Sequence, residues 1–320
     1  MRILLTGVSG FAGSALLPRL LEQGHDVRAL ARDRARVERT LAHGADGSLS
    51  DARLTDLDMV IGDTLTGAGV HRAMRDVEVA YYLIHSMEPS ARGSFRAREQ
   101  ASAKTFAEAA RAAGVRRIVY LGGPVPPNEN DASPHLSSRH EVERILLGAI
   151  GDSVALRASI VIGARSRSFR FLVRLVERLP VLTLPVWRRF RTQPIDERDV
   201  VEMLVACATH PSISGRSLDI GGPDVLSYGQ IIEGIAELMM VGRPTIGLGI
   251  AVTPIAARLA AVLAEESPEL VLPLMEGLTG DLLTGDEDVA EIMGVNLHSF
   301  DSAVEHALYE WEKVEPLAAR

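Results

Sequence analysis

Three glycines near the start of the chain, Gly7, Gly10 and Gly13, have the spacing of a turn that binds phosphate groups. They follow an apolar run, 3–6, that we expect to be a strand, and they open an amphipathic segment, 11–23, that we expect to be a helix. Glycine permits the tight turn, the approach of the backbone to a pyrophosphate and the close packing of helix on strand. The N–H groups at the helix start then bind the phosphates. The residues expected to contact a dinucleotide here are Thr6, Gly7, Ser9, Gly10, Phe11, Ala12 and Gly13.

The second predicted strand, 27–31, ends at Arg32. Sites for NAD usually carry an acidic residue at this point for the ribose 2′-hydroxyl, whereas an arginine suits the 2′-phosphate of NADP. We therefore expect NADP(H), with NAD(H) and a merely solvated Arg32 as the alternatives, because Asp33 is adjacent. After the third predicted strand, Gly62 and Asp63 are placed at the adenine edge, unless Asp63 only caps its own turn.

Polar residues also follow the fourth predicted strand, 79–84. Ile84, His85 and Ser86 stand at its carboxyl end, where the nicotinamide half of a dinucleotide runs in such sheets. We expect all three to contact the cofactor. The alternative for His85 is that it caps the end of its strand.

Short apolar runs alternate with longer helical patterns over the first half of the chain, which is typical of βαβ units and a buried parallel sheet. The expected strands are 3–6, 27–31, 59–61, 79–84, 117–121 and 154–156, and the expected helices are 11–23, 70–74, 95–113 and 138–147. The sequence thus predicts an α/β protein with a Rossmann-type doubly wound parallel sheet.

Residues 1–163 are expected to form the nucleotide-binding domain, and residues 164–320 a smaller mixed region for a substrate or partner. A strand near 217–220 is expected to interleave this region with the sheet. Other expected elements are helices over 169–179 and 197–209 and two helices that begin at Thr253-Pro254 and Ser267-Pro268.

The composition of the 320 residues, with 47% hydrophobic and 24% charged residues and a net charge of -8, is that of a globular protein and makes nucleic acid an unexpected partner. The lone Cys207 is expected to pack in the core. The nine histidines are scattered, so no metal site is expected. No secretory signal or transmembrane segment is recognised, and a cytoplasmic location is expected.

The glycine spacing and four further stretches resemble the atypical short-chain dehydrogenase/reductases, in particular the YbjT-like group of NAD(P)-binding proteins, which is related to NmrA-like proteins. These stretches are 80–87 (AYYLIHSM), 133–136 (SPHL), 191–195 (RTQPI) and 221–228 (GGPDVLSY). The resemblance covers nearly the whole chain and implies a nicotinamide dinucleotide cofactor.

In the reductases and epimerases of that superfamily, a Ser or Thr after the fifth strand and a Tyr-x-x-x-Lys pair carry the proton chemistry. Here the strand ends in Gly122-Gly123, and the register of the pair holds His135 and Arg139. The resemblance therefore makes these two the catalytic candidates. His135 titrates near neutrality, whereas Arg139 can bind the ribose or fix charge but cannot exchange a proton. The alternative is a structural or cofactor-contacting His135.

Two functions compete on these grounds. The first is an NADP(H)-dependent oxidoreductase that reduces a small apolar carbonyl or quinone without the usual Ser, Tyr and Lys. The second is a non-catalytic NADP(H)-binding redox sensor or assembly factor of the NmrA-like kind. The basic segment 165–191 suggests an anionic substrate or a protein partner, unless its arginines form a solvated helix face.

Overall fold

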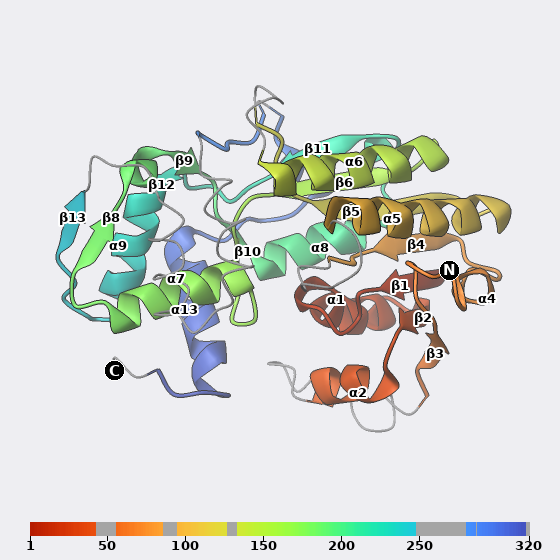
Figure 1. Cartoon of the computed structure of the whole chain (residues 1–320), viewed down its shortest axis with the longest axis horizontal. Helices are drawn as coiled ribbons and strands as arrows, with labels where there is room; N and C mark the ends of the chain where they lie inside the picture. Colours follow the sequence, from red (N-terminus) through yellow and green to blue (C-terminus); the bar gives the residue numbers. More distant parts are fainter. Residues whose placement is uncertain (43–55, 86–94, 127–132, 248–279, 286, 318–320) are drawn as a thin grey trace.

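The computed structural model describes residues 1–42, 56–85, 95–126, 133–247, 280–285 and 287–317. A seven-stranded sheet runs through the larger lobe (Figure 1). Its strands are β1 (Arg2–Thr6), β2 (Asp26–Ala31), β3 (Asp58–Ile61), β4 (Val79–Tyr82), β5 (Arg117–Gly122), β6 (Val154–Ala158) and β11 (Ser217–Ile220). The spatial order is β11-β6-β5-β4-β1-β2-β3, and every pairing is parallel. This arrangement confirms the predicted doubly wound α/β fold, whose crevice for a dinucleotide lies beyond the carboxyl ends of β1 and β4.

Helices cover both faces of the sheet. One face carries α1 (Phe11–Glu22) and α8 (Glu197–Cys207), and the other carries α5 (Phe95–Ala112) and α6 (Pro134–Ala149). Successive strand residues point to opposite faces, so Leu5 and Tyr81 join one hydrophobic core and Leu4 and Tyr82 join the other. Both faces are therefore buried, which explains the continuous apolar runs of the strands.

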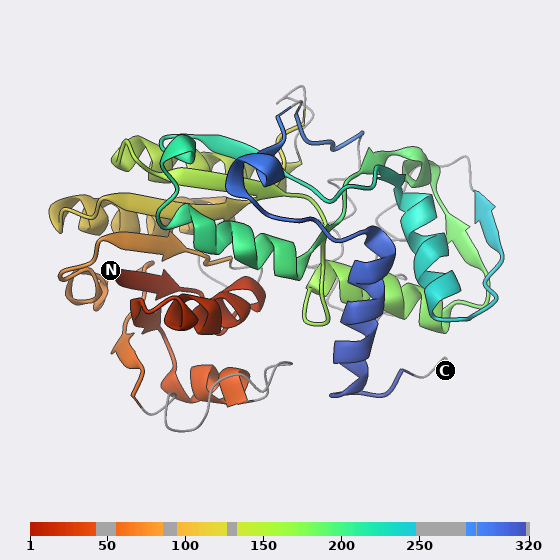
Figure 2. The same cartoon turned by 180° about the vertical axis from the view of Figure 1, so that it is seen from behind.

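A smaller lobe lies beyond the carboxyl edge of the sheet (Figures 1 and 2). Its third hydrophobic core joins α7 (Arg167–Arg178), α9 (Tyr228–Leu238) and α13 (Phe300–Glu312). The short strands are β7 (Val161–Ile162), β8 (Leu182–Leu184), β9 (Arg191–Thr192), β10 (Ile195–Asp196), β12 (Leu226–Ser227) and β13 (Thr245–Gly247), and the short helices are η2 (Val186–Arg189), η3 (Pro211–Ile213) and α12 (Val289–Met293). Because β11 pairs with β6, the chain returns from this lobe to the sheet.

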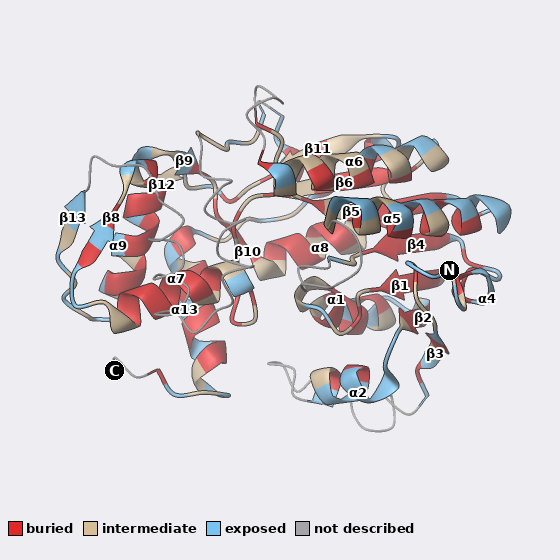
Figure 3. Ribbon diagram, viewed as in Figure 1, coloured by how far each residue is buried: buried red, intermediate tan, exposed pale blue. Residues whose placement is uncertain are grey.

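Several helices differ from the expected pattern, and α9, α12 and α13 were not predicted. Helix α2 (Arg34–Ala42) was not predicted, because it buries only Val37 and Leu41 and gives almost no apolar periodicity (Figure 3). Helix α6 begins at Pro134, four residues earlier than predicted. Ser133 caps it by accepting a hydrogen bond of 3.2 Å from the amide of Leu136, a signal carried by the Ser-Pro pair rather than by hydrophobic spacing.

Some of the remaining expectations can be compared with the structure, and others concern residues that it does not describe. The helix α4 (Val70–Ala73) and a fully buried Cys207 agree with the predictions. The helix starts expected at Thr253 and Ser267 lie outside the described residues. None of the described helices is long and apolar enough to cross a membrane.

Candidate functional site

The glycine turn after β1 is packed so closely that its glycines have no room for a side chain. Gly7 has a φ of +69°, and a Cβ there would lie 2.5 Å from the carbonyl oxygen of Leu83. A Cβ on Gly13 would lie 2.3 Å from the carbonyl oxygen of Gly7. The amide of Gly10 donates to that same carbonyl at 2.7 Å, which closes the turn. The sequence therefore folds here into a tight strand-to-helix junction.

Helix α1 begins at this turn without a cap. Gly10 occupies the N-cap position, no side chain caps the helix, and its first turn holds no acidic residue. The first N–H groups of an α-helix have no partner within the helix, so those at Phe11, Ala12 and Gly13 suit an anion. Ser9 lies half-buried in the turn. The geometry fits the pyrophosphate of a dinucleotide.

Thr6 serves the fold with its side chain. Its hydroxyl donates to the carbonyl of Tyr81 at 2.8 Å and accepts from the amide of Leu83 at 3.2 Å. These two bonds join β1 to the end of β4 at the point where the strand order reverses. Any contact of Thr6 with a cofactor is therefore expected from its backbone.

The ends of β2 and β3 present the residues expected at the adenosine half. Arg32 is exposed and makes no hydrogen bond or ion pair within the part of the chain that the structure describes. Gly62 packs against the carbonyl oxygen of Ala68, 2.3 Å from where its Cβ would be. Asp63 accepts a hydrogen bond of 2.8 Å from the amide of Leu65, so its carboxylate caps its own turn.

A polar cluster lies beyond the carboxyl ends of β4 and β5. His85 follows β4 after Ile84, and His135 and Arg139 stand one turn apart on α6. The Nη1 atom of Arg139 lies 3.1 Å from Nδ1 of His85, and the rings of His85 and His135 have their centroids 5.0 Å apart. The structure thus brings together His85, His135 and Arg139, whereas Ser86 lies outside the described residues.

Glu99, on the buried face of α5, is a member of this cluster that the sequence reasoning missed. Its Oε1 lies 3.3 Å from Nδ1 of His85, and its Oε2 accepts a hydrogen bond of 2.9 Å from the hydroxyl of Ser138. The signal was available, because Glu99 falls in the helical spacing of the apolar face with Ala103 and Phe106. A carboxylate at a core position is a polar group that needs partners.

Burial and neighbouring charges disfavour the protonated form of both imidazoles. Burial lowers the pKa of His135 to about 3, helped by His85 and Arg139. Burial and then Arg139 also lower the pKa of His85, while Glu99 acts in the opposite direction. Burial alone would raise the pKa of Glu99, but the hydrogen bond from His85 and the charge of Arg139 lower it, so the carboxylate is ionised.

Side chains pack closely against Gly122 and Gly123, where the related enzymes carry a catalytic hydroxyl. A Cβ on Gly122 would lie 2.8 Å from the ring of Tyr120, and a Cβ on Gly123 would lie 3.1 Å from the side chain of Leu136. Tyr120 is fully buried, its hydroxyl donates to the carbonyl of Arg139, and burial raises its pKa. Tyr120 is therefore a core residue and cannot supply the absent tyrosinate near neutral pH.

Two aspartates at the start of α8 have different roles. Asp196 caps the helix, because its carboxylate accepts from the amide of Arg198 at 2.7 Å. Asp199 binds His298 through the backbone amide and through Nδ1. Arg174 is 8% exposed and pairs with Glu177 and Glu315, so this part of the basic segment does not form a solvated face.

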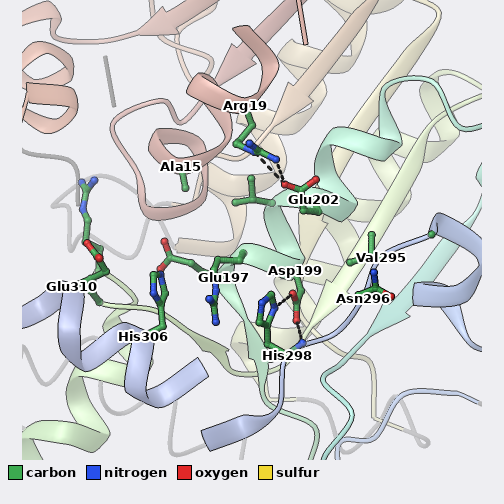
Figure 4. A pocket seen from close by; sticks show the side chains of 15 residues that line it. Ala15, Arg19, Glu197, Asp199, Glu202, Val295, Asn296, His298, His306 and Glu310 are labelled. Carbon is green, nitrogen blue, oxygen red and sulfur yellow. Dashed lines mark hydrogen bonds and ion pairs between the residues drawn. The ribbon is translucent and has the colours of Figure 1, made fainter. Parts of the chain in front are cut away.

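A pocket of about 550 Å³ opens between α1, α8 and α13 (Figure 4). The Asp199–His298 pair and an ion pair between Arg19 and Glu202 lie in its wall. The residues that line the pocket include none of those expected to bind the cofactor. Among the described residues, no group of three or more His, Cys, Asp or Glu side chains is arranged to hold a metal ion.

Known proteins with similar sequences include two oxidoreductases. A ceramide reductase from Caulobacter vibrioides is 27% identical over 241 residues, which are 74% of this chain and 70% of the relative. A 3-beta-hydroxysteroid dehydrogenase from Mycolicibacterium neoaurum is 27% identical over 183 residues, which are 50% of this chain and 46% of that relative.

The fold is also that of solved structures. The structure of MoeE5 in complex with UDP-glucose and NAD covers 98% of this chain and 99% of its own, with a TM-score of 0.69 and 18% identity, a likeness that shows the shared fold. The model of the NAD-dependent epimerase/dehydratase family matches residues 3–221, from β1 through β11. Because this match spans more than half of the sequence, the chain belongs to the NAD-dependent epimerase/dehydratase family, which binds a nicotinamide dinucleotide on a Rossmann-type sheet.

Proposed function

We propose that the turn from Gly7 to Gly13 binds NADP(H) in preference to NAD(H). Support comes from the exposed, unpaired Arg32, which stands at the end of β2 in the part of the chain that the structure describes. Beside it, Ile61 at the end of β3 is 45% exposed and offers an apolar surface. A guanidinium next to an apolar surface suits a 2′-phosphate next to an adenine ring.

We propose further that the chain is an oxidoreductase that exchanges a hydride between this cofactor and a small, largely apolar carbonyl compound or quinone. The observation that carries this proposal is the cluster of His85, His135 and Arg139 at the carboxyl edge, where the nicotinamide half of a dinucleotide runs. The two curated relatives are named for a ceramide and a steroid, and both names favour an apolar substrate.

The roles within the cluster follow from charge. Arg139 donates to the carbonyl of Leu121 and stays cationic, which suits an anchor for the ribose or for a developing negative charge. His135, with its pKa lowered to about 3 chiefly by burial, can accept a proton but holds none to give near neutral pH. We therefore propose that His85 or a water molecule is the general acid when the substrate is reduced.

The runner-up function is a non-catalytic NADP(H) sensor or assembly factor of the atypical, NmrA-like kind. It is favoured by one observation, the packing of Tyr120 and Leu136 against Gly122 and Gly123, where the family enzymes carry a catalytic hydroxyl. In both cases we propose that residues 1–163 hold the cofactor and that residues 164–320 face the substrate or partner. A cytoplasmic location stays a prediction.

One experiment separates the two functions. Purified protein is titrated with NADPH and NADP, and the absorbance of the reduced nicotinamide is then followed with a panel of carbonyl compounds and quinones. The oxidoreductase predicts turnover of at least one acceptor that falls when His85 or His135 is replaced by Gln. Tight binding without turnover of any acceptor favours the sensor.

A further inference from the structure

We infer that Glu99 is a positioning residue for His85, and that His85, held in this way, is the group that gives a proton to the substrate oxygen. This inference rests on the proposed oxidoreductase function. Nothing in the glycine turn or in the replaced Tyr-x-x-x-Lys pair points to Glu99. Its place in the site comes from the packing of α5 against α6.

The carboxylate of Glu99 is held at both oxygens. Its Oε1 faces Nδ1 of His85 at 3.3 Å, and its Oε2 accepts the hydroxyl of Ser138 at 2.9 Å. Glu99 is 6% exposed and Ser138 is fully buried, so water does not compete for the bond between these two side chains. A carboxylate fixed at both oxygens cannot rotate freely, and it therefore fixes the plane of the imidazole that it contacts.

His135 lacks such a partner. Within the described residues its interactions are ring contacts, with centroids 5.0 Å from His85 and 5.9 Å from Phe95. A buried imidazolium needs an anion or another acceptor beside it, because burial penalises the charged form. Glu99 is within hydrogen-bond reach of His85, whereas it acts on His135 only through its charge.

The charges around His85 make this carboxylate decisive. Arg139 on α6 and Arg167 at the start of α7 both disfavour a proton on His85, and His135 adds no negative charge. Among the described groups, Glu99 is the one that favours the protonated ring, through its hydrogen bond and its charge. Without Glu99, burial and the charges of Arg139 and Arg167 would all disfavour a proton on His85.

The proton balance of the step is simple. A nicotinamide dinucleotide held by the glycine turn would supply the hydride chemistry, so the carbonyl carbon of the substrate would gain a hydride and its π electrons would move to the oxygen. That oxygen takes the proton from Nε2 of the His85 imidazolium, which leaves a neutral ring whose Nδ1 faces Oε1 of Glu99 at 3.3 Å and Nη1 of Arg139 at 3.1 Å. Solvent then returns a proton to Nε2. In the direction of oxidation the neutral ring accepts the proton of the alcohol, so the same pair serves both directions.

The test compares Glu99→Gln with Glu143→Gln as the matched control. Glu143 is also a buried glutamate, 3% exposed, but its carboxylate binds Arg157 and Ser217 and not His85. In Glu99→Gln we expect kcat to fall about 10- to 100-fold at pH 7, while the dissociation constant for NADPH stays within about twofold. The decline of kcat with rising pH should begin at lower pH, because the ring loses its proton more easily. Glu143→Gln should keep the wild-type pH profile.

A pH-independent change in Glu99→Gln, or an unchanged kcat, would overturn the inference. So would a loss in His135→Gln larger than that in His85→Gln. If no acceptor is turned over by the wild type, the function itself fails, and the positioning is still decided by NMR titration of the His85 ring nitrogens. A His85 pKa that is the same in the wild type and in Glu99→Gln contradicts the inference, whereas a lower pKa in the variant supports it.

Discussion

The amide of Gly62 donates a hydrogen bond of 3.0 Å to the carbonyl of Ala31, so the residues that follow β2 and β3 lie side by side at the carboxyl edge. This pairing sets Arg32 next to the close-packed Gly62 turn, at the point where the adenosine half of a dinucleotide binds in Rossmann folds. The proposed preference for NADP(H) depends on Arg32 at this edge of the sheet.

Replacing Arg32 by Asp should raise the dissociation constant for NADPH about 10- to 100-fold, because a charge-assisted pair with the 2′-phosphate is replaced by repulsion. The dissociation constant for NADH should change by no more than about threefold. Fluorescence titration with both cofactors measures the ratio. An NADPH affinity that survives the change would refute the role given to Arg32.

Arg117 should be important for stability rather than for activity. The side chain is 2% exposed, pairs with Asp152 and donates to the carbonyls of Cys207 and His210, which ties β5 to the end of α8. Arg117→Met leaves these buried acceptors without partners and should lower the free energy of unfolding by about 3 kcal/mol. Urea denaturation provides the measurement.

The neighbouring Arg116 is the control for that variant. It contacts the same Asp152, but its side chain is 47% exposed. Arg116→Met should therefore cost no more than about 1 kcal/mol. An equal loss of unfolding free energy in the two variants would show that the burial of Arg117 does not increase its contribution to stability.

The lowered pKa of His135, about 3 and caused first by burial, predicts acid sensitivity. The unfolded chain binds a proton at this residue below about pH 6.5 whereas the native chain does not, so stability is lost as the pH falls from 6.5 towards 3. Between pH 7 and pH 5 this residue should account for about 2 kcal/mol of lost unfolding free energy.

His135→Gln should remove that loss, as seen in urea denaturation at the two pH values. His71 on α4 is exposed and serves as the control, since His71→Gln should leave the difference between pH 7 and pH 5 unchanged. A wild type and a His135→Gln variant with the same dependence on pH would contradict the assignment.

The parts of the site that are coded locally could be predicted. Gly7, Gly10 and Gly13 lie within one turn. A Cβ at Gly7 or Gly13 would meet backbone atoms, so the turn requires glycine there and its spacing can be recognised in the sequence. The strands could be predicted for a similar reason, since burial on both faces makes each a short apolar run. The first turn of α6, which carries His135, was missed because the start of this helix depends on the Ser133 cap.

The parts that depend on tertiary packing could not be predicted. Glu99 reaches His85 and Ser138 only because α5 packs against α6 at the end of β4, and no spacing in the sequence encodes that contact. The pairing of Asp199 likewise depends on the distant His298, which lies near the end of the chain. The sequence shows which residue types are present, whereas the contacts that these residues make depend on the fold.

The most direct test of the account is a titration of the purified chain with NADPH, compared between the wild type, Gly13→Ala and Gly148→Ala. A Cβ at Gly13 would lie 2.3 Å from the carbonyl oxygen of Gly7, whereas nothing lies within 4 Å of one at Gly148 on α6. We predict saturable binding in the wild type and in Gly148→Ala, and a loss of affinity of about tenfold or more in Gly13→Ala. No binding by the wild type, or equal binding by all three proteins, would contradict the assignment of the glycine turn as the dinucleotide site.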